Sequence, residues 1–229
     1  MEPESSLVVM HLVQTSDNIK QQMTYTSVVY HYDTIPSDLM DVITKDLETN
    51  FDPFLETSKL YGGGEDLDKR KSRNAWVPTT HWIGGLVWNY IEKANKEIFH
   101  YDLDFIDGES MQYTHYGIGE YYDWHQDEGL GTMYKPATAG QRGETIVQDF
   151  LNEKAEKVRK LTCILQLADE KDYTGGKVQL RDIDNTSIFA PKQRGSLILF
   201  DSRLQHRAMR VDSGLRKSLI SWCVGNRWK

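Results

Sequence analysis

The chain has 229 residues, of which 39% are hydrophobic and 27% charged, and its formal net charge is −7 at pH 7. This length suffices for one domain with a real core. The acidic balance argues against a general binder of phosphate backbones, so we expect no nucleic-acid partner. No apolar run approaches the roughly 20 residues of a membrane span, and the first residues lack the basic region of a signal peptide. We therefore expect no membrane association and a cytoplasmic location.

The two cysteines give a second indication of compartment. Cys163 and Cys223 both lie in apolar, strand-like stretches. Residues in such stretches are more commonly buried free thiols than partners in a disulfide, which agrees with a reducing compartment.

The first hundred residues predict helices that follow an initial strand. Residues 25–31 alternate toward β-branched and aromatic types, which predicts a strand. A helix should begin at Pro36, because the apolar residues that follow keep helical spacing. Residues 51–75 include a glycine run and should form a loop with short elements. Thr79 or Thr80 should cap a second helix whose apolar stripe packs on the core. The two stripes comprise Leu39, Met40, Ile43 and Leu47, and Ile83, Leu86, Val87, Tyr90, Ile91 and Ala94.

Strands should dominate from Asp102 onward, and two stretches of this half together predict an iron site. The first ends in His125-Gln-Asp127 and the second contains His206. On a strand, side chains two residues apart share a face, so His125 and Asp127 should point the same way. A histidine from a neighbouring strand can then complete a triad. Two histidines and one carboxylate, with the opposite face open, are typical of a non-haem Fe(II) oxygenase.

A cationic residue follows this triad at a fixed distance. Arg216 lies ten residues after His206 on a strand-like segment. The same segment presents Ser218 on the face of Arg216, while Lys217 should point to the opposite face. A guanidinium binds a carboxylate through two hydrogen bonds and keeps its charge when buried. The segment therefore places a guanidinium and a hydroxyl on one face, a combination that suits a carboxylate ligand.

The segment 128–158 separates the first half of the triad from the next predicted strand. Its start is rich in turn residues and should be mobile. Val147, Phe150, Lys154 and Val158 keep a helical period, which predicts a short amphipathic helix. A long loop beside a catalytic metal is often a lid or a substrate-binding element. The alternative, a solvated insertion without a function, stays open.

These motifs resemble those of the prolyl 4-hydroxylase-type dioxygenases that depend on 2-oxoglutarate and Fe(II). The family pattern Y-x-x-G-x-x-Y-x-x-H-x-D matches from Tyr116 to Asp127. Later matches in family order bring the resemblance to about residues 111–224. They are Arg159 with Thr162, the Gly175-Gly176 turn, Arg194-Gly195, His206, and Gly214-Leu215-Arg216 with Ser218 and Trp222. Arg70-Lys71-Ser72, Trp76, Asn95 and Phe99 resemble the family's N-terminal segment more loosely.

The resemblance implies a fold. It is mainly β with flanking helices, namely a double-stranded β-helix (a jelly-roll, cupin-like core) buttressed by N-terminal helices. It also implies a single domain over 1–229, with a support region at 1–108 and the core at 109–229.

The resemblance also implies roles for individual residues. His125, Asp127 and His206 would hold Fe(II), and 2-oxoglutarate would chelate the iron through its C1 carboxylate and C2 ketone. Arg216 would pair with the C5 carboxylate of 2-oxoglutarate, and Ser218 would add a hydroxyl hydrogen bond. Ascorbate is the accessory reductant that the family suggests.

Four further residues of the predicted co-substrate pocket follow from the same resemblance. Tyr116 would line the pocket and Thr162 would help to seat 2-oxoglutarate. Gln166 stands where animal and plant relatives often carry a tyrosine that contacts 2-oxoglutarate. Trp222 would back the pocket or pack in the core.

The activity implied is hydroxylation of an sp3 C–H bond, coupled to decarboxylation of 2-oxoglutarate to succinate and CO2. By resemblance the substrate is a prolyl residue of a peptide or protein. A free amino acid or another small metabolite is the alternative, and a catalytically silent β-barrel that binds a partner is a third. A nucleic-acid base dealkylase is disfavoured, because the second arginine of that family's last core strand is here Trp222.

Overall fold

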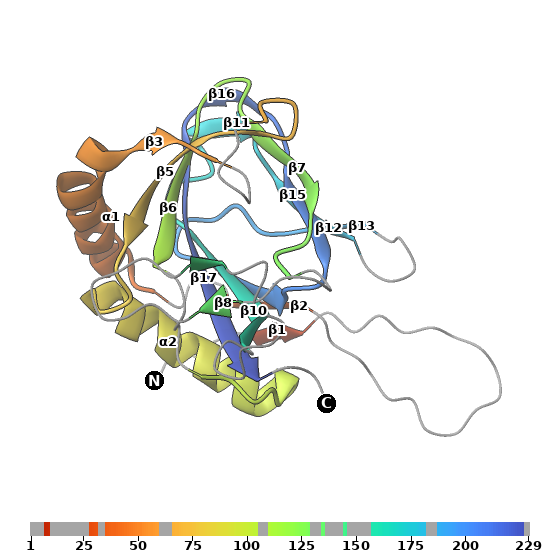
Figure 1. The fold of residues 1–229 in the computed structure, drawn as a ribbon. Coiled ribbons are helices and arrows are strands. Elements are labelled where there is room, and N and C mark those ends of the chain that lie inside the picture. Colours follow the sequence, from red (N-terminus) through yellow and green to blue (C-terminus); the bar gives the residue numbers. More distant parts are fainter. Residues whose placement is uncertain are drawn as a thin grey trace.

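The computed structural model describes residues 35–59, 66–104, 110–128, 157–181 and 187–226, together with strand segments at 7–9, 28–31, 134–135 and 144–145. Two antiparallel sheets face each other, and two helices cover the outer face of the larger sheet (Figure 1). None of the described helices is both long and apolar enough to span a membrane.

The large sheet has ten described strands, all antiparallel to their partners. Eight run in the order β1-β2-β14-β10-β17-β6-β5-β3, while β8 pairs with β10 and β9. The long strands β10 and β17 lie at its centre and pair over most of their length. The bounds are β1 Leu7–Val9, β2 Val28–His31, β3 Glu56–Thr57, β5 Arg73–Val77, β6 Met111–Tyr116, β8 Tyr134–Lys135, β9 Glu144–Thr145, β10 Lys157–Gln166, β14 Leu197–Asp201 and β17 Arg216–Asn226.

The small sheet has the order β13-β12-β15-β7-β4, and a separate pair is formed by β11 and β16. Apolar residues of both sheets meet in one buried cluster, which includes Ile164 and Phe200 of the large sheet and Leu180 of the small one. The bounds are β4 Arg70–Lys71, β7 Tyr121–His125, β12 Val178–Arg181, β13 Ser187–Phe189, β15 Gln205–Ala208, β11 Tyr173–Gly175 and β16 Val211–Gly214. This architecture confirms the predicted jelly roll with flanking helices.

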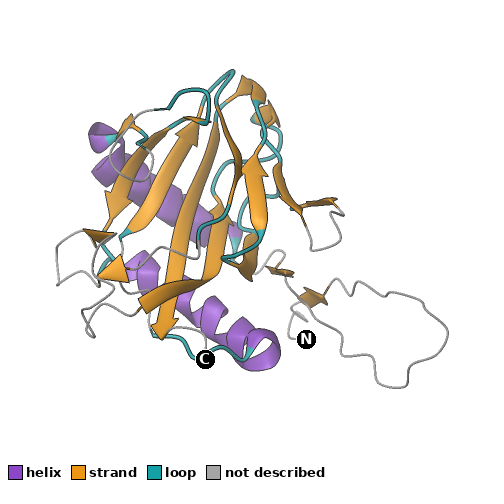
Figure 2. Ribbon diagram, turned by 45° about the vertical axis from the view of Figure 1, so that its right-hand side comes forward, coloured by secondary structure: helices purple, strands orange, loops and turns teal. Residues whose placement is uncertain are grey.

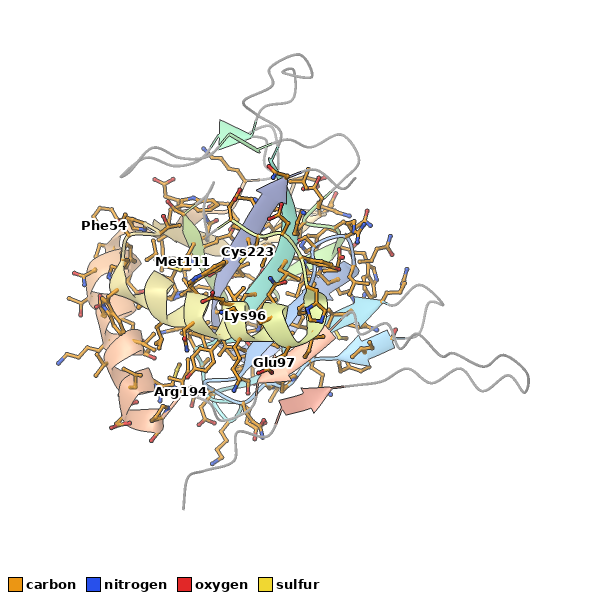
Figure 3. All side chains as sticks on the ribbon, turned by 90° about the horizontal axis from the view of Figure 1, so that it is seen from below. Phe54, Lys96, Glu97, Met111, Arg194 and Cys223 are labelled. Atoms are coloured by element: carbon orange, nitrogen blue, oxygen red, sulfur yellow. The ribbon has the colours of Figure 1, made fainter. Side chains whose placement is uncertain are left out.

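The helices bury one face each against the large sheet. They are α1 (Ser37–Phe51), continued by the 3-10 turn η1 (Asp52–Phe54), and α2 (Trp82–Ala94), continued by the π-helical turn η2 (Asn95–Phe99). Their apolar stripes join the outer residues of β5, β6, β10, β14 and β17 in the largest hydrophobic cluster. Figure 2 shows both helices behind the sheet, and Figure 3 shows α2 crossing its strands near Met111 and Cys223.

Two ion pairs add to this packing. Arg194 binds Asp41 of α1 at 2.8 Å, and Lys217 of β17 binds Glu48 of α1 at 2.6 Å. Lys217 therefore faces the helices, as its alternation with Arg216 predicted. Both ion pairs lie on the side of the sheet opposite the small sheet, where the apolar face of α1 packs.

Most of the predicted elements are confirmed, with local differences. Helix α1 starts after Pro36, and short elements occupy the described part of 51–75. The predicted cap of α2 is wrong: His81 precedes the helix, with no side-chain cap bond, because residues 78–81 close a turn (His81 N to Pro78 O, 2.9 Å) that delays its start.

Two other predictions lie partly outside the described residues. Residues 28–31 of the predicted first strand form β2, and residues 25–27 are not described. Val158, the last residue of the predicted amphipathic helix, lies in strand β10 instead. The rest of that helix and most of the predicted lid also fall outside the described residues.

Candidate active site

The two histidines are brought together by strand pairing in the small sheet. His125, the last residue of β7, lies directly opposite His206 of β15. The register shifts between this pair and the next, Tyr122 opposite Ala208, so β7 carries an extra residue. Such a bulge re-aims side chains. It turns Tyr122 and His125 to the same side, where their rings stack at 3.5 Å between centroids.

Asp127 reaches the histidines from a turn and not from a strand, which corrects the sequence-based expectation. Its backbone N–H and that of Glu128 both donate to the carbonyl of Ser202, each at 3.0 Å. The hydroxyl of Thr162 donates to Asp127 Oδ2 at 2.7 Å and also lies 2.9 Å from the Ser202 hydroxyl. The two backbone bonds to Ser202 therefore fix the main chain of Asp127, and the buried Thr162 hydroxyl orients its carboxylate.

The three side chains form a compact donor set. Asp127 Oδ1 lies 3.7 Å from His125 Nε2, and Asp127 Oδ2 lies 3.4 Å from His206 Nε2. One potential ligand atom from each residue lies within 4.8 Å of the others, so a single ion could contact all three. This is the arrangement typical of non-haem iron.

The protonation of the site suits a cation. His125 Nδ1 lies 2.7 Å from the carbonyl of Asp123 and His206 Nδ1 lies 3.0 Å from that of Leu204, which assigns the proton to Nδ1 and leaves each Nε2 a free acceptor. Burial, followed by the neighbouring His206, lowers the pKa of His125 to about 3. Burial alone would raise the pKa of Asp127, but the two histidines and the Thr162 hydrogen bond outweigh it and lower that pKa. Imidazole nitrogens and a carboxylate are the ligands that Fe(II) takes in sites of this kind.

A second polar cluster surrounds Arg216, the first residue of β17. The side chain is 2% exposed, and its Nη2 donates to Gln166 Oε1 at 3.1 Å. Its guanidinium lies 5.2 Å from the centre of the Tyr116 ring, the residue opposite it on β6. Burial raises the pKa of Tyr173, and the nearby Arg216 opposes that rise, which places a second phenol beside the guanidinium. No carboxylate of the described residues pairs with Arg216.

Two buried polar atoms on β17 in this cluster lack a partner, as does the hydroxyl of Tyr173. Arg216 Nε and Ser218 Oγ find no hydrogen-bond acceptor or donor in the described structure. Leaving such groups unpaired costs about 1–3 kcal/mol each, more for a charge. Gly176, at φ +58°, packs beside this guanidinium, because a Cβ there would lie 3.2 Å from Arg216 Cδ. A dicarboxylic acid such as 2-oxoglutarate would satisfy both atoms.

Two predicted co-substrate residues have partners within the protein, and their contact with 2-oxoglutarate stays a prediction. Thr162 bonds the carboxylate of Asp127, so its contact in the structure is with the triad. Gln166 accepts from Arg216, while its Nε2 donates to the carbonyl of Pro191 at 3.0 Å. Ser202 was not predicted at all, because nothing in its local sequence indicates that its carbonyl anchors Asp127.

Aromatic residues border the triad on the inner face of the large sheet. The indole of Trp222, opposite Thr162, lies 6.4 Å from that of Trp76, measured between ring centroids. The guanidinium of Arg159 lies 4.0 Å from the Trp222 ring and donates to the carbonyl of Asp127 at 3.3 Å. Trp222 is also among the groups that lower the pKa of Asp127, although its Nε1 is buried and has no hydrogen-bond acceptor in the described structure. The sequence motif contained Arg159 and Trp222, but it did not indicate that they stack.

A jelly roll that carries two histidines, an aspartate and a buried arginine defines a non-haem iron oxygenase with an acidic co-substrate. Residues 111–224 match the model of the 2OG-Fe(II) oxygenase superfamily, and the chain belongs to this family. It is a 2-oxoglutarate-dependent dioxygenase that uses Fe(II).

Solved structures agree on the fold at low sequence identity. A prolyl-4-hydroxylase of Pseudomonas putida superposes with a TM-score of 0.60 at 14% identity, over 89% of this chain and 94% of that one. A Trichoplax adhaerens prolyl hydroxylase, in complex with a peptide fragment of the hypoxia inducible factor oxygen degradation domain, gives 0.62 at 14%, over 86% and 83%. The viral collagen prolyl hydroxylase of Paramecium Bursaria Chlorella virus-1 gives 0.52 at 19%, over 86% and 96%. No curated protein sequence matches the chain.

Proposed function

We propose that this dioxygenase hydroxylates a prolyl residue of a peptide or protein. His125, Asp127 and His206 hold the iron, and Arg216 with Ser218 binds the C5 carboxylate of 2-oxoglutarate. Bound Fe(II) and 2-oxoglutarate would supply the oxidative chemistry with O2 as the oxidant: one oxygen atom goes into succinate, formed with CO2 from 2-oxoglutarate, and the other converts an sp3 C–H into an alcohol.

The residues of the chain have positioning tasks in this scheme. The Nδ1–H bonds of the two histidines fix their rings so that Nε2 faces the ion. Thr162 fixes the carboxylate of Asp127. The buried guanidinium of Arg216 orients 2-oxoglutarate by a charge-assisted pair, which is strong because water is excluded.

The observation that favours a prolyl substrate is the pair of indoles near Asp127. Proline is an apolar ring without a side-chain donor, so flat aromatic surfaces such as Trp76 and Trp222 suit it. Arg159, whose guanidinium lies 4.0 Å from the Trp222 ring, adds a cation beside this aromatic pair. The Trichoplax relative, which binds a peptide, supports a peptide substrate. A free amino acid is the second candidate.

The test is succinate formation from 2-oxoglutarate by purified protein with Fe(II), in air and without oxygen. The protein is assayed alone, with prolyl peptides and with free amino acids. Oxygen-dependent succinate that a prolyl peptide stimulates supports the proposal. Stimulation by free amino acids alone moves the assignment to a small-molecule hydroxylase. If neither turnover nor 2-oxoglutarate binding with Mn(II) is found, the proposal is wrong.

The cytoplasm is the location that we propose, since Cys163 and Cys223 are free thiols that lie buried on the neighbouring strands β10 and β17.

A further inference from the structure

A second buried arginine lies close to the iron site. Arg70, on the edge strand β4 of the small sheet, is only 7% exposed. No carboxylate pairs with it among the residues that the structure describes. A buried cation without a counter-charge costs several kcal/mol. The fold therefore retains a charge here that nothing in the described structure compensates.

The hydrogen bonds of Arg70 leave part of its guanidinium unused. Its Nε donates to the Ser72 hydroxyl at 2.9 Å, and that hydroxyl donates to Ser58 at 2.8 Å. Its Nη2 is buried and has no acceptor in the described part of the molecule. The guanidinium lies 4.6 Å from the centre of the Tyr122 ring, which holds it in place. The arginine is thus fixed by neutral groups, while one N–H₂ group stays unpaired.

Tyr122 lies in contact with both Arg70 and the proposed iron site. This ring has the guanidinium over it and stacks on His125, the proposed iron ligand, at 3.5 Å between centroids. One aromatic ring therefore separates Arg70 from the metal site. Tyr122 also packs with Tyr116, the ring beneath Arg216. Arg70 and Arg216, neither of which has a carboxylate partner among the described residues, lie over different tyrosines of one cluster. Each arginine can therefore bind a different carboxylate.

The surrounding sequence agrees with an anionic ligand. Residues 69–73 read Lys-Arg-Lys-Ser-Arg in a chain whose net charge is −7. Lys71 and Arg73 are exposed, while Arg70 points inward. The stretch that runs from the edge strand of the small sheet to the start of β5 in the large sheet is therefore locally basic on an acidic protein, and such a stretch favours the approach of an anion.

We propose that Arg70 binds a carboxylate of the substrate and thereby places the target C–H near the iron. The proposal rests on the proposed function and narrows its substrate class. The substrate has a carboxylate either on the target residue itself or on a residue next to it. The source is either an acidic side chain of a peptide or the free carboxyl group of a terminal residue or amino acid. Both offer the two oxygens that a guanidinium binds best.

The experiment uses matched pairs of probes with the full-length protein. Prolyl peptides that carry one glutamate, placed in turn at each neighbouring position, are compared with the same peptides carrying glutamine. A second pair compares a C-terminal prolyl peptide as free acid and as amide, together with L-proline. Binding is measured calorimetrically without oxygen on protein loaded with Mn(II) and 2-oxoglutarate, and succinate formation is measured with Fe(II) in air.

We expect one acidic probe to bind at least about tenfold more tightly than its neutral partner, a difference of about 1.4 kcal/mol. Arg70→Gln should abolish this ratio, and Arg70→Lys should keep part of it, because lysine retains the charge but cannot form two parallel bonds. Lys71→Gln removes the same charge from an exposed position of the same strand and should leave the ratio within about twofold. Affinity for 2-oxoglutarate should stay unchanged in all three variants.

The outcomes separate this inference from the proposed function. If prolyl probes bind and turn over, but acid and neutral partners are equal in the native protein, the inference is wrong and the proposed function stands. This comparison needs no variant, so misfolding of Arg70→Gln cannot obscure it. A preference that survives in Arg70→Gln also overturns it. If no prolyl peptide or proline binds or stimulates turnover, both proposals fail.

Discussion

Replacing Thr162 by valine should weaken metal binding while leaving the fold intact. The fully buried hydroxyl donates to Asp127 Oδ2 at 2.7 Å, and valine keeps nearly the same shape without the donor. A hydrogen bond to a charged group contributes about 1.5–3 kcal/mol, and loss of a residue that orients a metal ligand reduces affinity roughly 10- to 100-fold. These two magnitudes agree, because about 1.4 kcal/mol is one factor of ten. We therefore expect the Kd for Mn(II) or Fe(II) to rise by one to two orders of magnitude.

Calorimetric titration of metal-free protein with Mn(II) measures this change directly, without turnover. Thr162→Ser restores the donor and should recover most of the affinity. Ser202→Ala removes the bond between the two hydroxyls but keeps the donor to Asp127 and the backbone clamp, so its loss should be much smaller. Thermal melting of the metal-free variants controls for stability. A Kd of Thr162→Val within about threefold of the native value would refute the argument that this hydroxyl positions Asp127.

Three other predictions concern the triad, the co-substrate and acid stability. Arg216→Ala should raise the KM for 2-oxoglutarate about a hundredfold or more, because the C5 carboxylate loses a buried charge partner; steady-state kinetics check this, and a normal KM would contradict it. His125→Ala and Asp127→Ala should each abolish iron-dependent succinate formation with little change in melting temperature. His115→Gln should reduce the loss of stability in acid: burial lowers the pKa of His115 from 6.5 to about 4, so the native protein loses stability as pH falls between these values. Melting curves from pH 7 to pH 4 measure the difference, and parallel curves for both proteins would contradict it.

The parts of the site that could be predicted are those that follow from the spacing of residues along a strand. Arg216 and Ser218 share a face because strand side chains alternate, and alternation needs no knowledge of the tertiary structure. His206 could be expected opposite His125 because an antiparallel sheet brings distant strands together. Asp127 was expected on a strand and lies on a turn, since the bulge in β7 and the end of the strand at His125 leave no sign in the residue pattern.

The residues that sequence reasoning missed act through contacts between distant segments. Ser202 anchors Asp127 by its carbonyl, a group that every residue has, so no side-chain pattern could indicate it. Arg70 was named only as part of a loose resemblance to the family's N-terminal segment, and its burial and its unpaired Nη2 are what distinguish it from Lys71. Helix α1 was predicted well because its periodic stripe is buried as a unit. The start of α2 was displaced by a turn that competes with the expected threonine cap.

Strand β17 links the helices to the site. Its Arg216 and Ser218 face the cluster between the sheets, whereas Lys217 binds Glu48 of α1 and Leu219 joins the helix-side core. A shift of one residue would exchange these faces and replace the guanidinium by an ammonium. Gly214, at φ +77° just before the strand, fixes where it begins, and the apolar contacts with both helices fix its register. The helices therefore do more than cover the sheet: their packing determines which cation faces the cluster between the two sheets.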